Sequence, residues 1–217
     1  MIDTDMRILV FDSGIGGQAV AERLEELLPH VSVTSINDHE HMPYGEKTSD
    51  EIFNLTKNAI QPYIYEGYSV IVIACNTVTT NAITRLRSRY PSVNFIGIEP
   101  MVKPASALSS TKTIAVCATP STLKSSRYTA LKHKWLENFT VIEPDCQSWA
   151  ELIENGKSSE IDLITLMNSL IMQNVDVIVL GCTHYHWLRQ RMINAAPAMM
   201  ILEPSDALAR RINDILR

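Results

Sequence analysis

Two cysteines stand out because each ends a short apolar run and opens a polar tripeptide. Cys75 begins Cys-Asn-Thr after residues 70–74, and Cys182 begins Cys-Thr-His after residues 175–180. A predicted helix follows each tripeptide, so its N-terminal N–H groups and dipole favour the thiolate. Two thiols on opposite faces of one carbon can remove a proton from one face and return one to the other. That is acid–base inversion of a carbon centre without metal or organic cofactor.

Other side chains beside these thiols could support proton transfer. His184 lies two residues past Cys182 and could raise its thiolate population or polarise a substrate carboxylate. Asp12 ends another predicted strand and could accept or orient a proton near Cys75, or only cap the following helix. Gly14-Ile-Gly-Gly17 comes next, but it matches neither the dinucleotide fingerprint nor a P-loop. This turn indicates either a tight bend or a cradle for an anion.

The remaining cysteines and histidines carry weaker signals. Cys117 lies within a predicted strand, and we expect it to pack as a small apolar side chain. Cys146 lies in a polar loop and suits either a surface thiol or the periphery of a site. His186 suits either a helix near the site or the surface. The acidic and histidine residues at 38–41 lack a third distant ligand, so we expect no metal site there.

The composition narrows the class of protein. The chain has 217 residues, 46% of them apolar, and a formal net charge of −5. We expect a folded protein with a sizeable core and no general affinity for nucleic acid, since nucleic-acid binders normally carry a basic surplus. Residues 1–7 do not resemble a signal peptide, and no run of about 18 apolar residues suggests a membrane span. The four cysteines lack Cys-x-x-Cys spacing, so we expect reduced thiols in a cytoplasmic protein.

Short apolar runs alternate with amphipathic stretches, which is typical of parallel sheets covered by helices on both faces. The predicted strands are 8–11, 31–36, 70–74, 93–98, 113–117, 139–142, 175–180 and 199–202. The predicted helices are 16–28, a segment from Thr48 or Ser49 to about 65, a segment ending at 90, 122–134, two stretches around residues 155–156, about 185–195, and 206–216. The sequence therefore predicts an α/β fold.

An internal repeat divides the chain into halves. Residues 70–77 resemble residues 177–184 at an offset of 107, which aligns Cys75 with Cys182. Residues 8–13 align with residues 114–119 at an offset of 106. Agreement between the two offsets indicates duplication of an α/β unit, and we predict two small domains related by pseudo-symmetry. Ligands bind beyond the carboxyl ends of parallel strands, so we expect the two thiols to face one shared cleft.

Taken together, the motifs resemble glutamate racemases of the cofactor-independent aspartate/glutamate racemase superfamily. The matching segments follow the same order and spacing over nearly the whole chain: Phe11-Asp-Ser-Gly-Ile-Gly-Gly17, Pro43-Tyr-Gly45, Ala74-Cys-Asn-Thr77 and Gly181-Cys-Thr-His-Tyr185. His184 favours glutamate racemase, because aspartate racemases usually carry Glu at this position. The family commonly has Pro after His-Tyr, where this chain has His186-Trp187.

The resemblance implies an α/β fold of two pseudo-symmetric domains, each a parallel sheet flanked by helices, with the active site in the cleft between them. One domain would comprise residues 1–97 and the returning residues 204–217, and the other residues 98–203. The implied activity interconverts L- and D-glutamate, without cofactor or metal, and supplies D-glutamate for peptidoglycan in the cytoplasm. The implied partner is the substrate, with neither nucleic acid nor membrane, and the resemblance allows a homodimer.

The resemblance also assigns residues. Cys75 would take the proton from D-glutamate with help from Asp12, and Cys182 would take it from L-glutamate with help from His184. The implied substrate-binding positions are Ser13, Pro43, Tyr44, Gly45, Asn76, Thr77, Thr119, Thr183 and Glu154. No Arg stands in any of these motifs, so we expect hydroxyls, an amide and helix N-termini to hold the carboxylates of glutamate.

Three alternatives stay open from the sequence. The chain could be a racemase of the same superfamily that acts on aspartate or another amino acid. It could be a catalytically silent descendant that binds an amino acid as a regulator, although both cysteines are present. It could be a nucleotide-binding α/β module, an alternative that only the glycine-rich turn supports.

Overall fold

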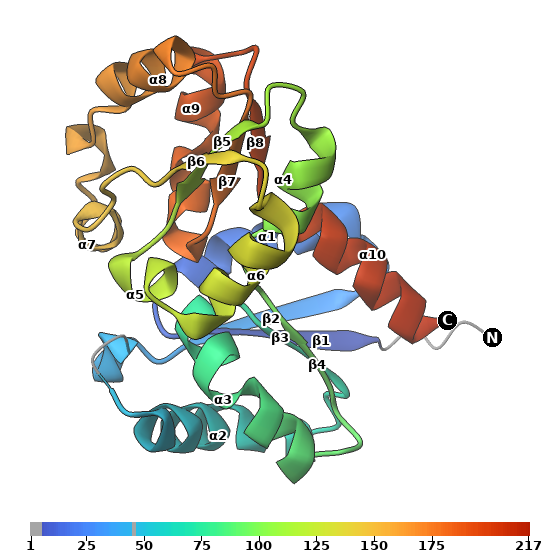
Figure 1. Cartoon of the computed structure of the whole chain (residues 1–217). Helices are drawn as coiled ribbons and strands as arrows, with labels where there is room; N and C mark the ends of the chain where they lie inside the picture. Colours follow the sequence, from blue (N-terminus) through green and yellow to red (C-terminus); the bar gives the residue numbers. More distant parts are fainter. Residues whose placement is uncertain (1–5, 45–46) are drawn as a thin grey trace. The chain divides into compact units, whose positions relative to one another are not determined.

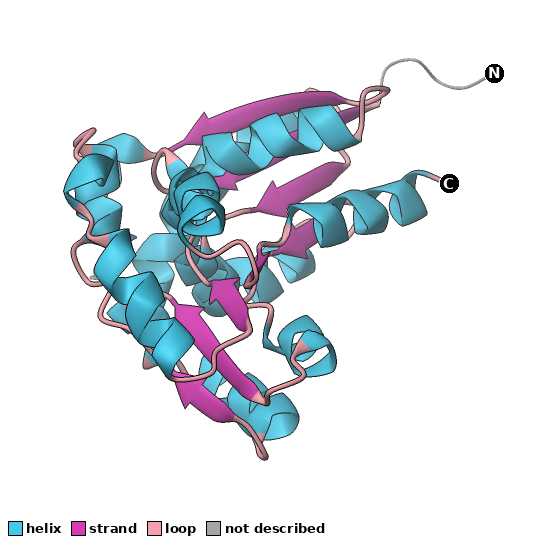
Figure 2. Ribbon diagram, turned by 90° about the horizontal axis from the view of Figure 1, so that it is seen from above, coloured by secondary structure: helices cyan, strands magenta, loops and turns pink. Residues whose placement is uncertain are grey.

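The computed structural model describes residues 6–44 and 47–217, so Gly45, an implied substrate contact, lies outside the described residues. The chain divides into two compact units. Unit 1 combines the chain up to Ile98 with the C-terminal segment Pro204–Arg217, and unit 2 is Glu99–Glu203. Figure 1 follows the chain by colour from blue to red, and Figure 2 shows helices flanking the strands.

The sheet of unit 1 has four parallel strands in the order β2-β1-β3-β4. The strands are β1 (Arg7–Asp12), β2 (Ser32–Asn37), β3 (Val70–Ile73) and β4 (Asn94–Gly97). The two central strands consist almost wholly of buried residues, most of them apolar, as expected for strands that are covered on both faces. Their side chains alternate between two separate cores.

The helices of unit 1 cover the two faces of this sheet (Figure 1). Ile8 and Val10 of β1 face a core that contains Leu24 of α1 (Gly16–Leu27) and Leu208 of α10 (Ser205–Leu216). Leu9 and Phe11 face the other core, with α2 (Ser49–Tyr65) and α3 (Asn76–Arg89). This period of two follows from the pleat of the strand.

Unit 2 repeats the arrangement with the strand order β6-β5-β7-β8. Its strands are β5 (Thr113–Cys117), β6 (Thr140–Ile142), β7 (Val177–Leu180) and β8 (Met200–Leu202). Its helices are α4 (Val102–Leu108), α5 (Pro120–Leu123), α6 (Ser126–Leu136), α7 (Trp149–Glu154), α8 (Leu163–Met172) and α9 (Arg189–Ala195). Side chains of α4 and α6 pack against β5 and β7 in one core.

The pairing register confirms the internal repeat. Ile8 pairs with Val70 in unit 1, and Ile114 pairs with Val177 in unit 2. These are the residues that the offsets of 106 and 107 align. Just beyond the strands, the N–H of Ala74 donates to the carbonyl of Phe11, and the N–H of Gly181 donates to the carbonyl of Cys117, both at 2.8 Å. The residues before the two thiols are therefore held in the same way.

Most predicted elements agree with the structure to within about two residues, and Thr48 rather than Ser49 caps α2, in a capping box with Glu51. The helix predicted at 122–134 is wrong in form, because Ser125 accepts a hydrogen bond from the N–H of Tyr128 and starts a new helix there. The predicted helix at 185–195 begins with a 3₁₀ turn, Thr183–Leu188. Helix α4 was not predicted. In the described part of the chain, no helix combines the length and apolar character of a membrane span.

Candidate active site

The fold of unit 1 brings Cys75 next to residues from the neighbouring strand. Cys75 follows β3 and stands at the N-cap of α3, while Asp12 ends β1 and Ser13 follows it. Because β1 and β3 are adjacent and parallel, their carboxyl ends meet at one edge of the sheet. The Cys75 Sγ lies 3.2 Å from the Ser13 Oγ, and all three side chains are buried.

Opposing effects act on the Cys75 thiol. Burial raises its pKa from 9.0 to about 11, and the negative charge of Asp12 adds to this rise. The Ser13 hydroxyl and the backbone N–H groups of Val78 and Thr77 lower the pKa in part. The N–H groups at the start of α3 therefore favour the thiolate, as expected, but desolvation has the larger and opposite effect. Cys75 is a neutral thiol at pH 7.

Asp12 contacts the turn that follows it and also acts electrostatically on Cys75. Its Oδ1 accepts a hydrogen bond of 2.9 Å from the N–H of Gly14 and so shapes the following turn. The same carboxylate raises the pKa of the nearby Cys75 thiol. Gly17 explains part of the glycine-rich turn, since a Cβ there would lie 2.5 Å from the Asp12 Cβ. Glycine at this position keeps open the space that Asp12 fills.

Besides Thr77, which is half-buried, three more implied residues of unit 1 are described. Tyr44 is buried in the same core as Cys75, and its hydroxyl donates to the Asp38 Oδ2 at 2.6 Å. Burial, Asp38 and Cys75 all raise the Tyr44 pKa, so the hydroxyl stays protonated. Asn76 is buried, and its Oδ1 accepts no hydrogen bond from the described residues. Pro43, by contrast, is exposed.

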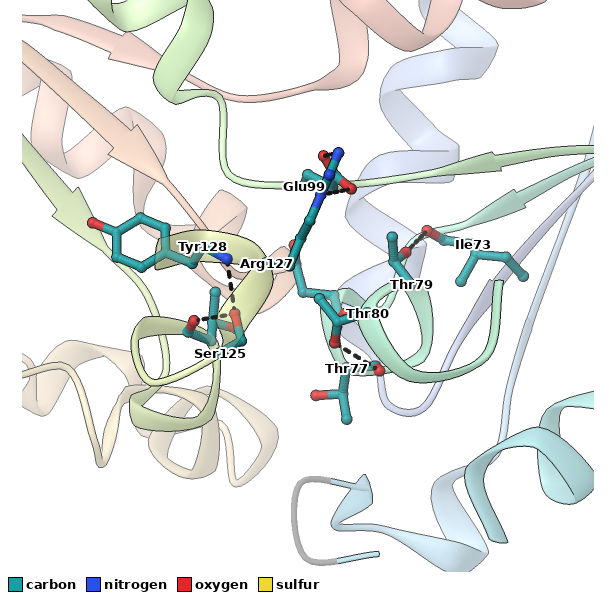
Figure 3. A network of polar contacts seen from close by, with 10 residues as sticks. Ile73, Thr77, Thr79, Thr80, Glu99, Ser125, Arg127 and Tyr128 are labelled. Carbon is teal, nitrogen blue, oxygen red and sulfur yellow. Dashed lines mark hydrogen bonds and ion pairs between the residues drawn. The ribbon is translucent and has the colours of Figure 1, made fainter. Parts of the chain in front are cut away.

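The first turns of α3 are fixed by their own threonines (Figure 3). The Thr79 Oγ1 donates to the carbonyl of Ile73 at 3.3 Å, which ties the helix to the end of β3. The Thr80 Oγ1 donates to the carbonyl of Thr77 at 3.1 Å. These contacts hold the segment that carries Cys75, and sequence patterns had not indicated them.

Unit 2 holds the second thiol beside a histidine and a carboxylate. Cys182 follows β7, and its Sγ lies 3.6 Å from the His184 Nδ1. The His184 Nε2 lies 2.5 Å from the Glu154 Oε1 at the end of α7. All three side chains are buried. A carboxylate on Nε2 favours the tautomer that leaves Nδ1 as the acceptor facing the thiol.

The two implied threonines of unit 2 occupy different positions. Thr119 follows β5 and is the N-cap of α5, where its hydroxyl accepts from the N–H of Thr122 at 3.3 Å. Thr183 is buried in the 3₁₀ turn directly after Cys182. Both follow the carboxyl ends of neighbouring strands, as Ser13 and Asn76 do in unit 1.

Sequence reasoning missed a buried group behind Cys182. The Tyr185 hydroxyl donates to the carbonyl of Cys146 at 2.9 Å. Burial raises the Tyr185 pKa, and the charges of Cys182, Cys146 and Cys117 contribute. Cys146 is 2% exposed, so the surface position considered for it is wrong, whereas Cys117 is fully buried as predicted. The mixed polar and apolar sequence around Cys146 did not predict that this side chain is buried.

The His186 side chain is only 7% exposed, which corrects the alternative of a surface side chain. Its Nδ1 lies 3.7 Å from the Glu203 Oε2. Burial lowers the His186 pKa to about 4, so its imidazole is neutral at pH 7.

Across residues 6–44 and 47–217, no three His, Cys, Asp or Glu side chains group as metal ligands. The His41 Nδ1 instead lies 2.6 Å from the Asp38 Oδ1.

Each unit thus presents one buried thiol at the equivalent strand end, with an acid–base partner. Cys75 has Asp12 and Ser13 beside it, and Cys182 has His184 and Glu154. Thiols, imidazoles and carboxylates are all groups that can exchange protons. Proton transfer to and from a substrate is the chemistry that both half-sites support.

Comparison with protein families gives a match to the Asp/Glu/hydantoin racemase model over residues 17–212. Among curated relatives, the glutamate racemase of Pseudomonas putida strain W619 is 35% identical, over 100% of this chain and 83% of the relative. The glutamate racemase of Pseudomonas aeruginosa strain UCBPP-PA14 is 34% identical, over 95% of this chain and 80% of the relative.

Solved structures show the same likeness. The Escherichia coli glutamate racemase, in complex with L-glutamate and the activator UDP-MurNAc-ala, aligns with a TM-score of 0.84 and 28% identity, over 98% of this chain and 82% of that one. The glutamate racemase of Francisella tularensis SCHU S4, in complex with D-glutamate, aligns with a TM-score of 0.76 and 25% identity, over 98% and 81% of the two chains.

Proposed function

This chain belongs to the Asp/Glu/hydantoin racemase family, and we propose that it is a glutamate racemase that inverts the α-carbon of L- and D-glutamate with two cysteines. One observation carries the mechanism. Cys75 and Cys182 each lie two residues after a register-matched strand, β3 or β7, so the repeat supplies one buried thiol at the same position of each unit. A racemase that moves protons between two faces of one carbon needs two such groups.

In the proposed reaction, Cys182 as thiolate removes the α-proton of L-glutamate, and Cys75 as thiol donates its proton to the opposite face. The product is D-glutamate, with Cys182 now the thiol and Cys75 the thiolate. The reverse reaction restores the first state. The raised pKa of Cys75 supports this order, because the substrate-free protein holds Cys75 in the proton-donating form. A thiolate with so high a pKa is also a strong base for the reverse step.

Partner residues assist each thiol in this scheme. His184, oriented by Glu154, accepts the proton of Cys182 and so prepares its thiolate. Asp12 keeps Cys75 protonated through its negative charge, and it faces the ammonium group of the bound amino acid. The scheme requires only proton transfer, so neither a metal nor an organic cofactor takes part.

The substrate would lie beyond the carboxyl ends of the strands that precede the two thiols. Helix N-termini and hydroxyls would hold the carboxylates of glutamate through Ser13, Thr77, Thr119 and Thr183. The partner-free Oδ1 of Asn76 supports a contact with the ammonium group. Pro43 and Tyr44 would line one side of the substrate, since a dry site favours ionisation of a weak carbon acid. In the cell, the product D-glutamate would enter peptidoglycan synthesis in the cytoplasm.

Solvent exchange tests this function directly. In deuterated water, the protein is expected to replace the α-proton of L-glutamate and to abolish its optical rotation over time. Cys75→Ala and Cys182→Ala should each lower racemisation by at least about a thousandfold, because each removes one of two obligatory acid–base groups. Cys117→Ala is the matched control, since it deletes a buried thiol that the mechanism does not use, and it should keep activity within a few-fold.

The outcomes separate the alternatives. Exchange with aspartate but not glutamate would move the assignment to another racemase of the family. Binding of glutamate without exchange would favour a silent amino-acid-binding protein. Equal activity of wild type and both alanine variants would refute the two-cysteine mechanism.

A further inference from the structure

Asp38 makes several hydrogen bonds, although the proposed reaction gives it no role. It follows β2, and its N–H donates to the carbonyl of Asp12 at 3.2 Å. Its Oδ2 accepts from the Tyr44 hydroxyl at 2.6 Å, and its Oδ1 lies 2.6 Å from the His41 Nδ1. The carboxylate is 12% exposed. Asp38 therefore contacts the end of β1 through its backbone, and the 3₁₀ turn His39–His41 and Tyr44 through its carboxylate.

The Tyr44 ring is the part of this network nearest to the chemistry. Tyr44 is 2% exposed and belongs to the same apolar core as Cys75 and Val78 of α3. The charge of a Cys75 thiolate is one of the causes that raise the Tyr44 pKa. A shift of the ring would therefore change the wall beside the thiol.

The types of these residues suit a fixing role. A carboxylate has two oxygens that accept only, so Asp38 can serve Tyr44 and His41 at once. Hydrogen bonds to a charged acceptor are about twice as strong as neutral ones. The hydroxyl of Tyr44 is committed to Asp38, so the ring has a defined position before any substrate binds.

We propose that Asp38 is a positioning residue, which fixes Tyr44 and the preceding segment 38–43 so that the wall beside Cys75 is formed before glutamate binds. The inference rests on the proposed function for its catalytic meaning. The structural claim, that Asp38 fixes the position of Tyr44, concerns unit 1 alone. It can be tested without an assay of racemisation.

Kinetics of matched variants test the catalytic part. Asp38→Ala should raise KM for both enantiomers of glutamate about five- to tenfold and change kcat less than about twofold, because the binding wall loosens while the thiols remain. Asp38→Asn should retain near-normal KM, since its amide can accept from Tyr44 and donate to His41. Glu40→Ala removes an exposed carboxylate from the same turn and should leave both constants unchanged.

Non-additivity provides a second criterion. Tyr44→Phe deletes only the hydroxyl, so its effect on KM should point the same way as that of Asp38→Ala. The double variant should be no worse than Asp38→Ala alone, because both changes break one contact. Independent, additive effects would overturn the proposal, as would a drop in kcat with unchanged KM.

Alkylation of cysteines tests the structural part and does not depend on racemisation. Iodoacetamide labelling, read by peptide mass spectrometry, gives the ratio of Cys75 to Cys182 modification in one molecule. Asp38→Ala should raise this ratio about fivefold, and Asp38→Asn and Glu40→Ala should not. If Asp38→Ala fails to fold, Tyr44→Phe gives the same test. A wild type without racemase activity would refute the proposed function, whereas an unchanged labelling ratio would refute the positioning role.

Discussion

At the scale of single residues, the charge state of Cys75 depends on a balance between burial and hydrogen bonding. The N-terminus of α3 and the Ser13 hydroxyl stabilise the thiolate, whereas burial and Asp12 oppose it. Burial is the largest effect, so the folded pKa lies above the ordinary value. Because the pKa of Cys75 is raised on folding, its protonated thiol contributes to the unfolding free energy. This contribution is fully present below about pH 9 and is lost as the pH rises through about 11.

Replacing Asp12 tests this balance. Asp12→Asn removes a negative charge near Cys75 and should lower the thiol pKa from about 11 towards 9, so that alkylation of Cys75 becomes faster at pH 8 to 9. Racemisation should fall at the same time, because the carboxylate is lost from the site. The measurement is the pH dependence of Cys75 alkylation.

Ser13→Ala is the matched control for that experiment. The Ser13 hydroxyl lowers the Cys75 pKa, so its removal should move the alkylation midpoint upwards. Midpoints that shift in the same direction for both variants would contradict the assigned electrostatics.

At the scale of elements, the first turn of α1 determines where Asp12 lies. Gly17→Ala would place a Cβ 2.5 Å from the Asp12 Cβ, and neither backbone can move freely because β1 is buried. We expect a loss of about 1–3 kcal/mol of unfolding free energy from overpacking, together with reduced racemisation. Chemical denaturation and an activity assay measure the two effects.

Gln18→Ala serves as the control on the same helix. Gln18 is exposed, and its side chain donates a hydrogen bond to Glu22 on the same helix. This variant should change unfolding free energy by less than about 0.5 kcal/mol. A Gly17→Ala protein as stable and active as Gln18→Ala would show that the turn adapts and that Gly17 does not position Asp12.

Local patterns predicted the elements well where burial is two-sided. The runs Val70–Ile73 and Val177–Leu180 contain only aliphatic residues, and both are central strands. The pattern failed between α5 and α6, where a single cap at Ser125 breaks a continuous helical signal. A side-chain hydrogen bond of this kind depends on the local backbone path, which apolar periodicity does not report.

An ion pair within unit 2 involves the first residue of the unit, Glu99. The Arg127 guanidinium of α6 binds both carboxylate oxygens of Glu99, at 2.8 and 2.9 Å (Figure 3). Glu99 follows β4 and begins unit 2 in the chain. The pair fixes the start of the unit to α6, although both side chains are too accessible for a large contribution to stability.

At the scale of the whole molecule, each unit has its own sheet and core, so protection from hydrogen exchange should repeat along the chain. Amides of β1 and β3 should exchange slowest in unit 1, and those of β5 and β7 in unit 2, because these central strands are the most buried. The partly exposed strands β2 and β6 should exchange faster. Exchange followed by mass spectrometry measures this order, and equal protection of edge and central strands would contradict it.

The sequence by itself determined the α/β class, the duplication and the positions of both thiols at strand ends. These features follow from apolar periodicity and from the repeat, which are local or register-preserving properties of the chain. Only the tertiary structure decided that burial keeps Cys75 protonated, that Glu154 meets His184, and that Asp38 holds Tyr44. Desolvation and the pairing of particular side chains depend on packing in three dimensions, and no spacing along the chain encodes them.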